Sequence, residues 1–215
     1  MSITVVINNR NLLSWPKAMV EKIQSYSSLE DILIIDNDSS YEPLLEWYDT
    51  LNIKVLKIPN IGHTSPWIPE INAFIKTESY VVTDPDLDLS ETPIDTLTHL
   101  DNCLKEYPFL EKIGLGLDIK SVPLESPFYA HVNSHEKKFW NLPLINNKFR
   151  IAPIDTTFAI YNKKIMNEYK ITGARMNYPY VAKHIPWNLV ERSDEFNYYI
   201  NEANKSSSYK TFLNL

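Results

Sequence analysis

The chain has 215 residues, of which 44% are hydrophobic and 22% are charged, the composition of a globular protein with one sizeable core. Its 27 acidic and 21 basic residues give a net charge of −6, so we expect no nucleic-acid partner, because neutralising phosphates requires a basic surface. One cysteine excludes an internal disulfide and a thiolate zinc cluster. The positions of the four glycines match neither a P-loop, a dinucleotide-binding fingerprint nor the serine-hydrolase elbow.

The sequence gives no sign of a membrane segment or of export. Nowhere do about 18 apolar residues run together, so we expect no membrane span. Residues 3–7 open directly into a strand-like run without a charged leader, which favours a cytoplasmic location. Since neither an internal repeat nor a linker interrupts the chain, we expect a single domain over residues 1–215.

The first hundred residues alternate short apolar runs with helical stretches. The apolar runs, which we expect to be buried strands, cover residues 3–7, 32–35, 53–56 and 80–83. Helical stretches between them begin near residue 14, cover about 42–51 and continue to about 76. This alternation predicts an α/β fold, with a Rossmann-like, mainly parallel central sheet flanked by helices.

The second half has a less regular pattern. Its expected elements are a helix at 93–107 with Thr92 as cap and Asp95 as its box partner, a strand at 113–119, a strand at 151–161 interrupted by Asp155, and a helix at 194–203. Residues 121–150 are rich in proline and asparagine, which favours a lid or acceptor loop. Residues 178–188 are expected to form an ordered loop.

Polar residues follow three of the predicted parallel strands, at 8–11, 36–40 and 84–88. Open α/β sheets bind ligands at the carboxyl ends of their strands, so these segments should meet at one edge. Pro85 holds Asp84 extended, which points Asp84 and Asp86 to the same side, where both carboxylates can share Mg²⁺ or Mn²⁺. Asp88 is an alternative ligand, and the alternative for the whole motif is that acidic residues merely end a strand.

The segments 5–11, 32–40 and 81–86 resemble the nucleotide-binding half of GT-A fold glycosyltransferases, near family 2, and more narrowly the capsid-decorating glycosyltransferase domains of large algal viruses. The resemblance implies a nucleotide-binding half at 1–100 and an acceptor-side half at 101–215. It also implies transfer of a sugar from a nucleoside diphosphate sugar, UDP-sugar favoured, to a hydroxyl of a glycan or glycoprotein, with Mn²⁺ or Mg²⁺ as cofactor. A viral origin would place the protein in the host cytoplasm.

The resemblance also implies roles for individual residues. Asp36 would contact the nucleoside, while Asp84 and Asp86 would hold the metal on the donor diphosphate, and His184 would be a third metal ligand. The remaining donor-binding candidates are Asn8, Asn9, Arg10, Asn60, Gly62, Arg175 and Lys183. Among these, Asn60 and Gly62 resemble an Asn-x-Gly turn of the family, although residues 63–67 replace its usual glycine-rich continuation.

Asp155 is the candidate general base, because an inverting transfer needs a base that faces the acceptor hydroxyl. The alternative is that Asp155 is a strand carboxylate paired with Arg150 or Arg175. Three tryptophans could stack on sugar faces or simply belong to the core, namely Trp67, Trp140 and Trp187.

The sequence is also compatible with two other functions. A haloacid-dehalogenase-like phosphatase also places two aspartates after a strand, but Asp88 and Ser90 stand where that family's pattern continues differently. A carbohydrate-binding domain without turnover would keep the fold and dispense with the two aspartates.

Overall fold

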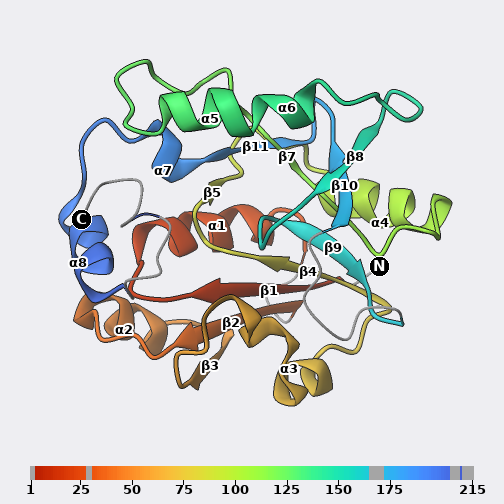
Figure 1. Ribbon diagram of the computed structural model, residues 1–215. Coiled ribbons are helices and arrows are strands. Elements are labelled where there is room, and N and C mark those ends of the chain that lie inside the picture. Colours follow the sequence, from red (N-terminus) through yellow and green to blue (C-terminus); the bar gives the residue numbers. More distant parts are fainter. Residues whose placement is uncertain (1–2, 28–30, 165–171, 204–208, 210–215) are drawn as a thin grey trace.

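The computed structural model describes residues 3–27, 31–164, 172–203 and 209 (Figure 1). Its main sheet has eight strands in the order β3-β2-β1-β4-β9-β6-β10-β8, and a smaller sheet has the order β5-β11-β7. The pairs among β1, β2, β3 and β4, and the pair β6–β10, are parallel. The expected α/β class with a mainly parallel central sheet flanked by helices is therefore confirmed.

The first half follows the predicted alternation. Its elements are β1 (Thr4–Asn9), α1 (Ser14–Gln24), β2 (Ile32–Asn37), α2 (Glu42–Asp49), β3 (Lys54–Ile58), a 3-10 turn (Gly62–Trp67), α3 (Pro69–Phe74), β4 (Ser79–Thr83) and β5 (Leu87–Asp88). Alternate side chains of a strand face opposite sides of the sheet, so Val5 and Ile7 pack with α1, whereas Val6 packs on the α3 side. Both faces are thereby buried, as the apolar runs predict.

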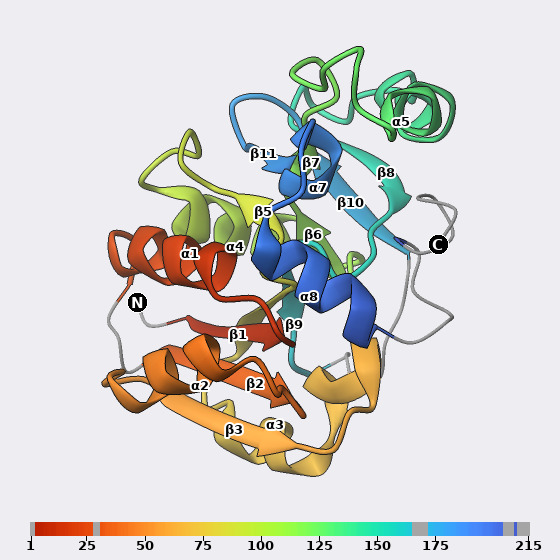
Figure 2. The same cartoon turned by 90° about the vertical axis from the view of Figure 1, so that its left-hand side faces the viewer.

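The second half adds antiparallel strands to the parallel ones. Its elements are α4 (Thr96–Glu106), β6 (Lys112–Gly114), β7 (Gly116–Leu117), α5 (Tyr129–His135), α6 (Lys137–Trp140), β8 (Phe149–Pro153), β9 (Ala159–Asn162), β10 (Thr172–Met176), β11 (Val181–His184), α7 (Ile185–Asn188) and α8 (Asp194–Glu202). Strand β9 pairs antiparallel with both β4 and β6 and so joins the two halves. Figure 2 looks toward the carboxyl end of β1 and shows α8 lying across it.

Several expectations for the second half are wrong. The apolar run 113–119 is split between two sheets as β6 and β7, and the run 151–161 forms two strands that are not neighbours. The predicted loops at 121–150 and 178–188 contain helices α5, α6 and α7 and strands β8 and β11. In each case pairing with a distant strand or packing of a short helix decided the structure, and local periodicity does not reveal either.

The predicted cap of α4 is also wrong. The helix begins one residue after Asp95, which takes the N-cap position without a capping hydrogen bond to its side chain. The Asp95 carboxylate accepts a hydrogen bond from the Tyr180 hydroxyl instead. The Thr92 hydroxyl instead donates to the carbonyl of Leu89 at 2.6 Å. Among the described residues, no helix is long and apolar enough to cross a membrane.

A buried lysine supports the loop that connects β8 to β9. Lys112 of β6 is fully buried, and its ammonium group donates to the carbonyl oxygen of Ile154 at 2.6 Å and contacts the hydroxyl of Tyr161 at 3.4 Å. Burial lowers the pKa of Lys112 to about 8. The residues that follow Ile154 are thus fixed from inside the protein.

We expect the stabilising effect of Lys112 to grow with pH. The unfolded chain keeps the lysine proton up to a pKa near 10.5, whereas the folded protein loses it near 8, so the unfolding free energy rises with pH between these values. Urea unfolding at pH 7 and pH 9.5 should show wild type gaining about 2 kcal/mol relative to Lys112→Met. An unchanged difference between the two proteins would contradict a lowered lysine pKa.

Candidate functional site

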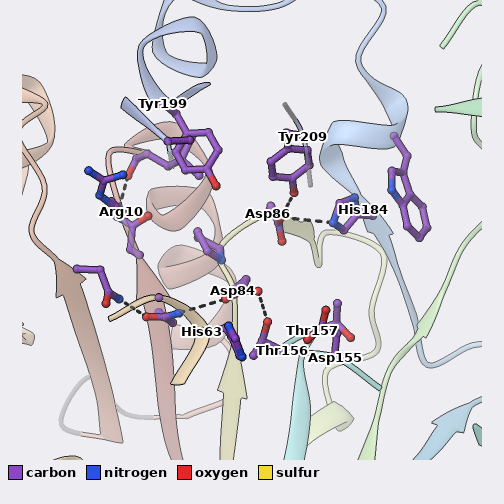
Figure 3. A pocket seen from close by; sticks show the side chains of 18 of the residues that line it. Arg10, His63, Asp84, Asp86, Asp155, Thr156, Thr157, His184, Tyr199 and Tyr209 are labelled. Carbon is purple, nitrogen blue, oxygen red and sulfur yellow. Dashed lines mark hydrogen bonds and ion pairs between the residues drawn. The ribbon is translucent and has the colours of Figure 1, made fainter. Parts of the chain in front are cut away.

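A polar pocket of about 440 Å³ opens at the carboxyl ends of β1 and β4 (Figure 3). The chain leaves β1 toward β2 and β3 on one side of the sheet, and β4 lies on the other side. The strand order thus changes direction between β1 and β4, and open α/β sheets characteristically bind ligands at such a point. Residues from both halves line the pocket, including the loop 154–158, β11 and α8.

Asp84 lies at the centre of a hydrogen-bond network across this reversal. The Asn8 amide donates to its carboxylate at 3.4 Å, and the Thr156 hydroxyl donates to the other oxygen. Behind Asn8, the Ser65 hydroxyl donates to the Asn8 side-chain oxygen at 2.6 Å, and the Asn37 amide donates to the same oxygen. The network fixes the orientation of the Asp84 carboxylate at the floor of the pocket.

Asp86 has one engaged and one unengaged carboxylate oxygen. Its Oδ2 lies 3.3 Å from Nε2 of His184 and accepts a hydrogen bond from the hydroxyl of Tyr209. Its Oδ1 is buried and, like Nδ1 of His184, has no hydrogen-bond partner among the described residues. A buried oxygen without a partner is energetically costly, which indicates that a ligand normally satisfies it.

Strand pairing brings His184 to Asp86 across almost a hundred residues of sequence. Strand β11 runs antiparallel to β5, with His184 opposite Leu87, and the backbone N–H of Ile185 donates to the Asp86 carbonyl at 2.8 Å. The Trp187 ring packs against the imidazole, with 4.4 Å between the ring centroids. His184 is therefore held beside Asp86 by backbone geometry.

The two aspartates differ in their ionisation. Burial and the neighbouring charge of Asp86 raise the pKa of Asp84 well above its usual value. Burial would also raise the pKa of Asp86, but the charge of His184 and the hydrogen bonds from His184 and Tyr209 outweigh it and lower that pKa. Two nearby carboxyls with opposite shifts are typical of functional sites.

The donor set fits a hard divalent cation. Within the described ranges, no three or more histidine, cysteine, aspartate or glutamate side chains are arranged to hold a metal ion. Magnesium-type sites, however, often use only one or two carboxylates, with the remaining positions filled by water and substrate phosphates. Asp84 and the unengaged oxygen of Asp86 suit such a site.

Asp155 lies in the loop 154–158 and lines the pocket with an exposed side chain. The backbone N–H of Asp84 donates to the Thr156 carbonyl at 2.8 Å, which places this loop against the end of β4. Both arginines considered as alternative partners have contacts of their own: Arg150 binds Leu142 and Asn177, and Arg175 binds Pro153 and Glu136. The role of Asp155 as a base stays a prediction.

The other candidates divide into two groups. Asn8, Asn9, Arg10, Asn60 and Gly62 line the pocket. Gly62 has a φ of +70° and its N–H donates to the Asn60 side chain at 3.1 Å, so the expected turn is present and its glycine is needed for the backbone conformation.

The structure does not bring Asp36, Arg175 or Lys183 to the pocket. Asp36 is buried and accepts a hydrogen bond from Ser39, Arg175 forms an ion pair with Glu136, and Lys183 pairs with Glu91 at 2.6 Å. Side-chain alternation along β2 turns Asp36 away and leaves the next residue, Asn37, on the pocket side.

Sequence reasoning missed Asn37, Ser65, Thr156 and Tyr209. The polar run at the end of β2 contained a signal for Asn37, but choosing between Asn37 and Asp36 required the register of the strand. Ser65, Thr156 and Tyr209 come from a 3-10 turn, a loop and the end of the chain, where no periodic pattern places them.

Comparisons with known proteins support the fold. No family model matches the chain, and no curated protein matches it in sequence. Among solved structures, the mannosyltransferase PcManGT from Pyrobaculum calidifontis, in complex with GDP-Man and Mn²⁺, has a TM-score of 0.55 at 12% identity, over 99% of this chain and 68% of that one.

Other similar structures include glucosyl-3-phosphoglycerate synthase from Mycobacterium tuberculosis, with a TM-score of 0.47 at 12% identity, over 76% of this chain and 57% of that one. TarS from S. aureus has a TM-score of 0.42 at 13% identity, over 76% of this chain and 47% of that one. At 12% identity, the likeness to the PcManGT structure shows a GT-A-like fold and nothing beyond the fold. The narrower resemblance to viral domains stays a prediction.

We expect Asp84→Asn to stabilise the protein without ligand at neutral pH. The folded protein raises the pKa of Asp84, so ionisation costs stability as pH rises above about 4. Asparagine avoids this cost, and its one side-chain oxygen still accepts the Thr156 hydrogen bond, at the expense of the long 3.4 Å bond from Asn8. At pH 7.5 the variant should melt at least about 2 °C higher than wild type, and at pH 4 the two should coincide.

Asp38→Asn is the matched control for Asp84→Asn, because Asp38 is exposed at the neighbouring strand end. Its melting temperature should follow that of wild type at both pH values. Equal melting of Asp84→Asn and wild type at pH 7.5 would show that the Asp84 carboxylate is not destabilised in the fold.

Proposed function

We propose that this protein is a metal-dependent glycosyltransferase that moves a sugar from a nucleoside diphosphate sugar, UDP-sugar favoured, to a hydroxyl of a glycan or glycoprotein acceptor. The observation that carries the proposal is the buried Oδ1 of Asp86, which has no hydrogen-bond partner among the described residues. It lies beside Asp84 in a pocket at the strand-order reversal of a GT-A-like fold. The fold's likeness to a mannosyltransferase complexed with GDP-Man and Mn²⁺ is consistent with it.

Asp84 and Asp86 would hold Mn²⁺ or Mg²⁺ together with the donor diphosphate. A divalent cation there stabilises the negative charge that develops on the departing diphosphate. His184 and Tyr209 orient the Asp86 carboxylate through its Oδ2 and leave Oδ1 toward the ligand. Whether His184 itself ligates the metal, as the family resemblance implies, stays a prediction.

The donor's remaining contacts would come from the β1 end of the pocket. Arg10 lines it, with one guanidinium nitrogen donating to the Glu202 carbonyl at 2.8 Å and its buried Nε without a partner among the described residues. That nitrogen can donate to a phosphate or ribose oxygen. The amides of Asn8 and Asn9 are already engaged inside the protein and would shape the floor.

Asp155 would act as the general base. It lies on a loop fixed at two points, by the bond from Lys112 to Ile154 and by the bonds between Thr156 and Asp84. Its carboxylate is exposed at the pocket, where it can accept a proton from an acceptor hydroxyl as that oxygen attacks the anomeric carbon. The fixed loop keeps this carboxylate close to the metal-binding aspartates.

Metal-dependent binding of UDP tests the proposal directly. Wild type should gain about 5–10 °C in melting temperature with Mn²⁺ and UDP at about one hundred times the dissociation constant, and little with UDP in EDTA. Asp86→Ala should lose this gain, because it removes the only carboxylate with an unengaged buried oxygen among the described residues.

Asp88→Ala is the matched control, since it changes an aspartate two residues further along that does not line the pocket. It should respond like wild type. Retention of the Mn²⁺-dependent gain in an Asp84→Ala/Asp86→Ala protein would refute the metal site. Stabilisation by vanadate in place of UDP would favour the phosphatase.

Asp155→Asn separates chemistry from binding. If Asp155 is the base, the variant should keep the Mn²⁺ and UDP response and lower the rate of sugar transfer by about 10²–10⁴, the usual contribution of a positioned base. UDP release from a UDP-sugar in the presence of acceptor is the measurement. If the variant instead lost donor binding, Asp155 would belong to the donor-binding part of the pocket and would not be the general base.

A further inference from the structure

A second, larger groove lies on the other side of α5 from the pocket. It encloses about 700 Å³ and shares no lining residue with the pocket. Its walls come from the loop 119–124, helices α5 and α6, strand β8 and the turn after β10 (Figure 1). The aromatic residues Tyr129, Trp140 and Tyr178 and the cations Lys120, Lys137 and Arg150 line it.

The aromatic rings of the groove are held in place before any ligand arrives. The Trp140 indole N–H donates to the Leu117 carbonyl at 3.0 Å, and the Tyr178 hydroxyl donates to the Asp118 carboxylate at 2.7 Å. The two rings lie 5.3 Å apart at an interplanar angle of 30°. Tyr178 nevertheless keeps 41% of its surface exposed. Rigid, exposed aromatic rings bind flat apolar faces with little loss of entropy.

The charge of the groove is opposite to that of the whole chain. Lys120, Lys137 and Arg150 line it, and no aspartate or glutamate does, although acidic residues outnumber basic ones 27 to 21 in the sequence. None of the three cations forms an ion pair with a carboxylate in the described part of the chain. Their charge is therefore available to an anionic ligand.

Two of the three cations lie over the aromatic rings. The Lys120 ammonium is 4.7 Å from the centre of the Tyr178 ring, and the Arg150 guanidinium is 4.9 Å from the centre of the Trp140 ring. A fitting ligand thus carries an apolar face and an anionic group on the same unit. A sugar ring with a carboxylate or sulfate has this combination, since its axial C–H groups form an apolar face.

We infer that this groove binds an anionic glycan chain. Nucleic acid also offers flat faces and negative charge, but three cations on a chain of net charge −6 neutralise too few phosphates for stable binding. A neutral glycan would leave the cations unused. Binding here needs neither donor nor metal, so the inference stands apart from the proposed sugar transfer; if transfer also occurs, the groove identifies the class of acceptor.

Helix α5 lies between the groove and the pocket. Tyr129 and Asn133, four residues apart, lie on the groove side, whereas Phe128 and His131 lie on the pocket side. A chain bound in the groove is therefore separated from the candidate active site only by the width of one helix. This position suits a site that holds the part of an acceptor remote from the reacting sugar.

Calorimetric titration of the full chain tests the inference, with hexagalacturonate as the probe and EDTA in the buffer. Wild type should bind hexagalacturonate at least ten times more tightly than uncharged maltohexaose, and the affinity should fall as NaCl rises. Lys120→Gln/Lys137→Gln should weaken binding at least tenfold. Lys17→Gln/Lys57→Gln removes the same charge from exposed positions on α1 and β3 and should stay within twofold of wild type.

Several results would overturn the inference. If both double variants weakened hexagalacturonate binding equally, the effect would come from net charge and not from the groove. If wild type bound maltohexaose as tightly as hexagalacturonate, the cations of the groove would have no role in binding. In a separate titration without EDTA, competition by UDP with Mn²⁺ would show that the ligand binds in the pocket. Tighter binding of oligo(dT) than of hexagalacturonate would make the groove a nucleic-acid site. Because the titration contains no metal or donor, failure here leaves the Mn²⁺ and UDP response, and with it the proposed transfer, intact.

Discussion

Antiparallel pairing of β9 with β4 is the constraint on which the site depends. The pairing runs from Ser79 opposite Asn162 to Val82 opposite Ala159, and it stops where β4 reaches Asp84. The chain entering β9 must therefore pass beside that aspartate, and Thr156 bonds to it through both backbone and side chain. Since β9 also pairs with β6, the second half of the fold is fixed onto the first at this point.

The two buried aspartates of the site are in an unfavourable electrostatic environment, which a bound cation would make favourable. Asp84 is held where its ionised form is unfavourable, and Asp86 remains ionised through His184 and Tyr209. Buried carboxylates without full hydrogen bonding reduce the stability of the fold, and such cost is usually found where binding compensates for it. Oδ1 of Asp86, which has no hydrogen-bond partner in the described part of the chain, is therefore the atom on which the proposed metal site rests.

The first half of the fold could be predicted because its signals are local. Apolar runs such as 3–7 and 32–35, with polar ends and helical stretches between them, indicate buried parallel strands, and the sheet order β3-β2-β1-β4 agrees. The second half could not be predicted, since β6 lies between β9 and β10 in the sheet although β7, α5, α6 and β8 separate β6 from β9 in sequence. Gly116 illustrates this: an added Cβ would lie 2.5 Å from the Met176 carbonyl, a contact no local pattern reveals.

The sequence by itself determined that Asp84 and Asp86 directly follow a buried strand at the carboxyl edge of the sheet, because strand polarity and Pro85 settle their position locally. Only the tertiary structure decided which partners reach them. Strand pairing brings His184 beside Asp86, and the pairing that fixes β9 brings Thr156 to Asp84. The hydroxyl of Tyr209, far from Asp86 in sequence, adds a further hydrogen bond to that carboxylate. Side-chain alternation along β2 likewise buried Asp36 and left Asn37 at the pocket, because a change of one residue in register reverses the direction of a side chain.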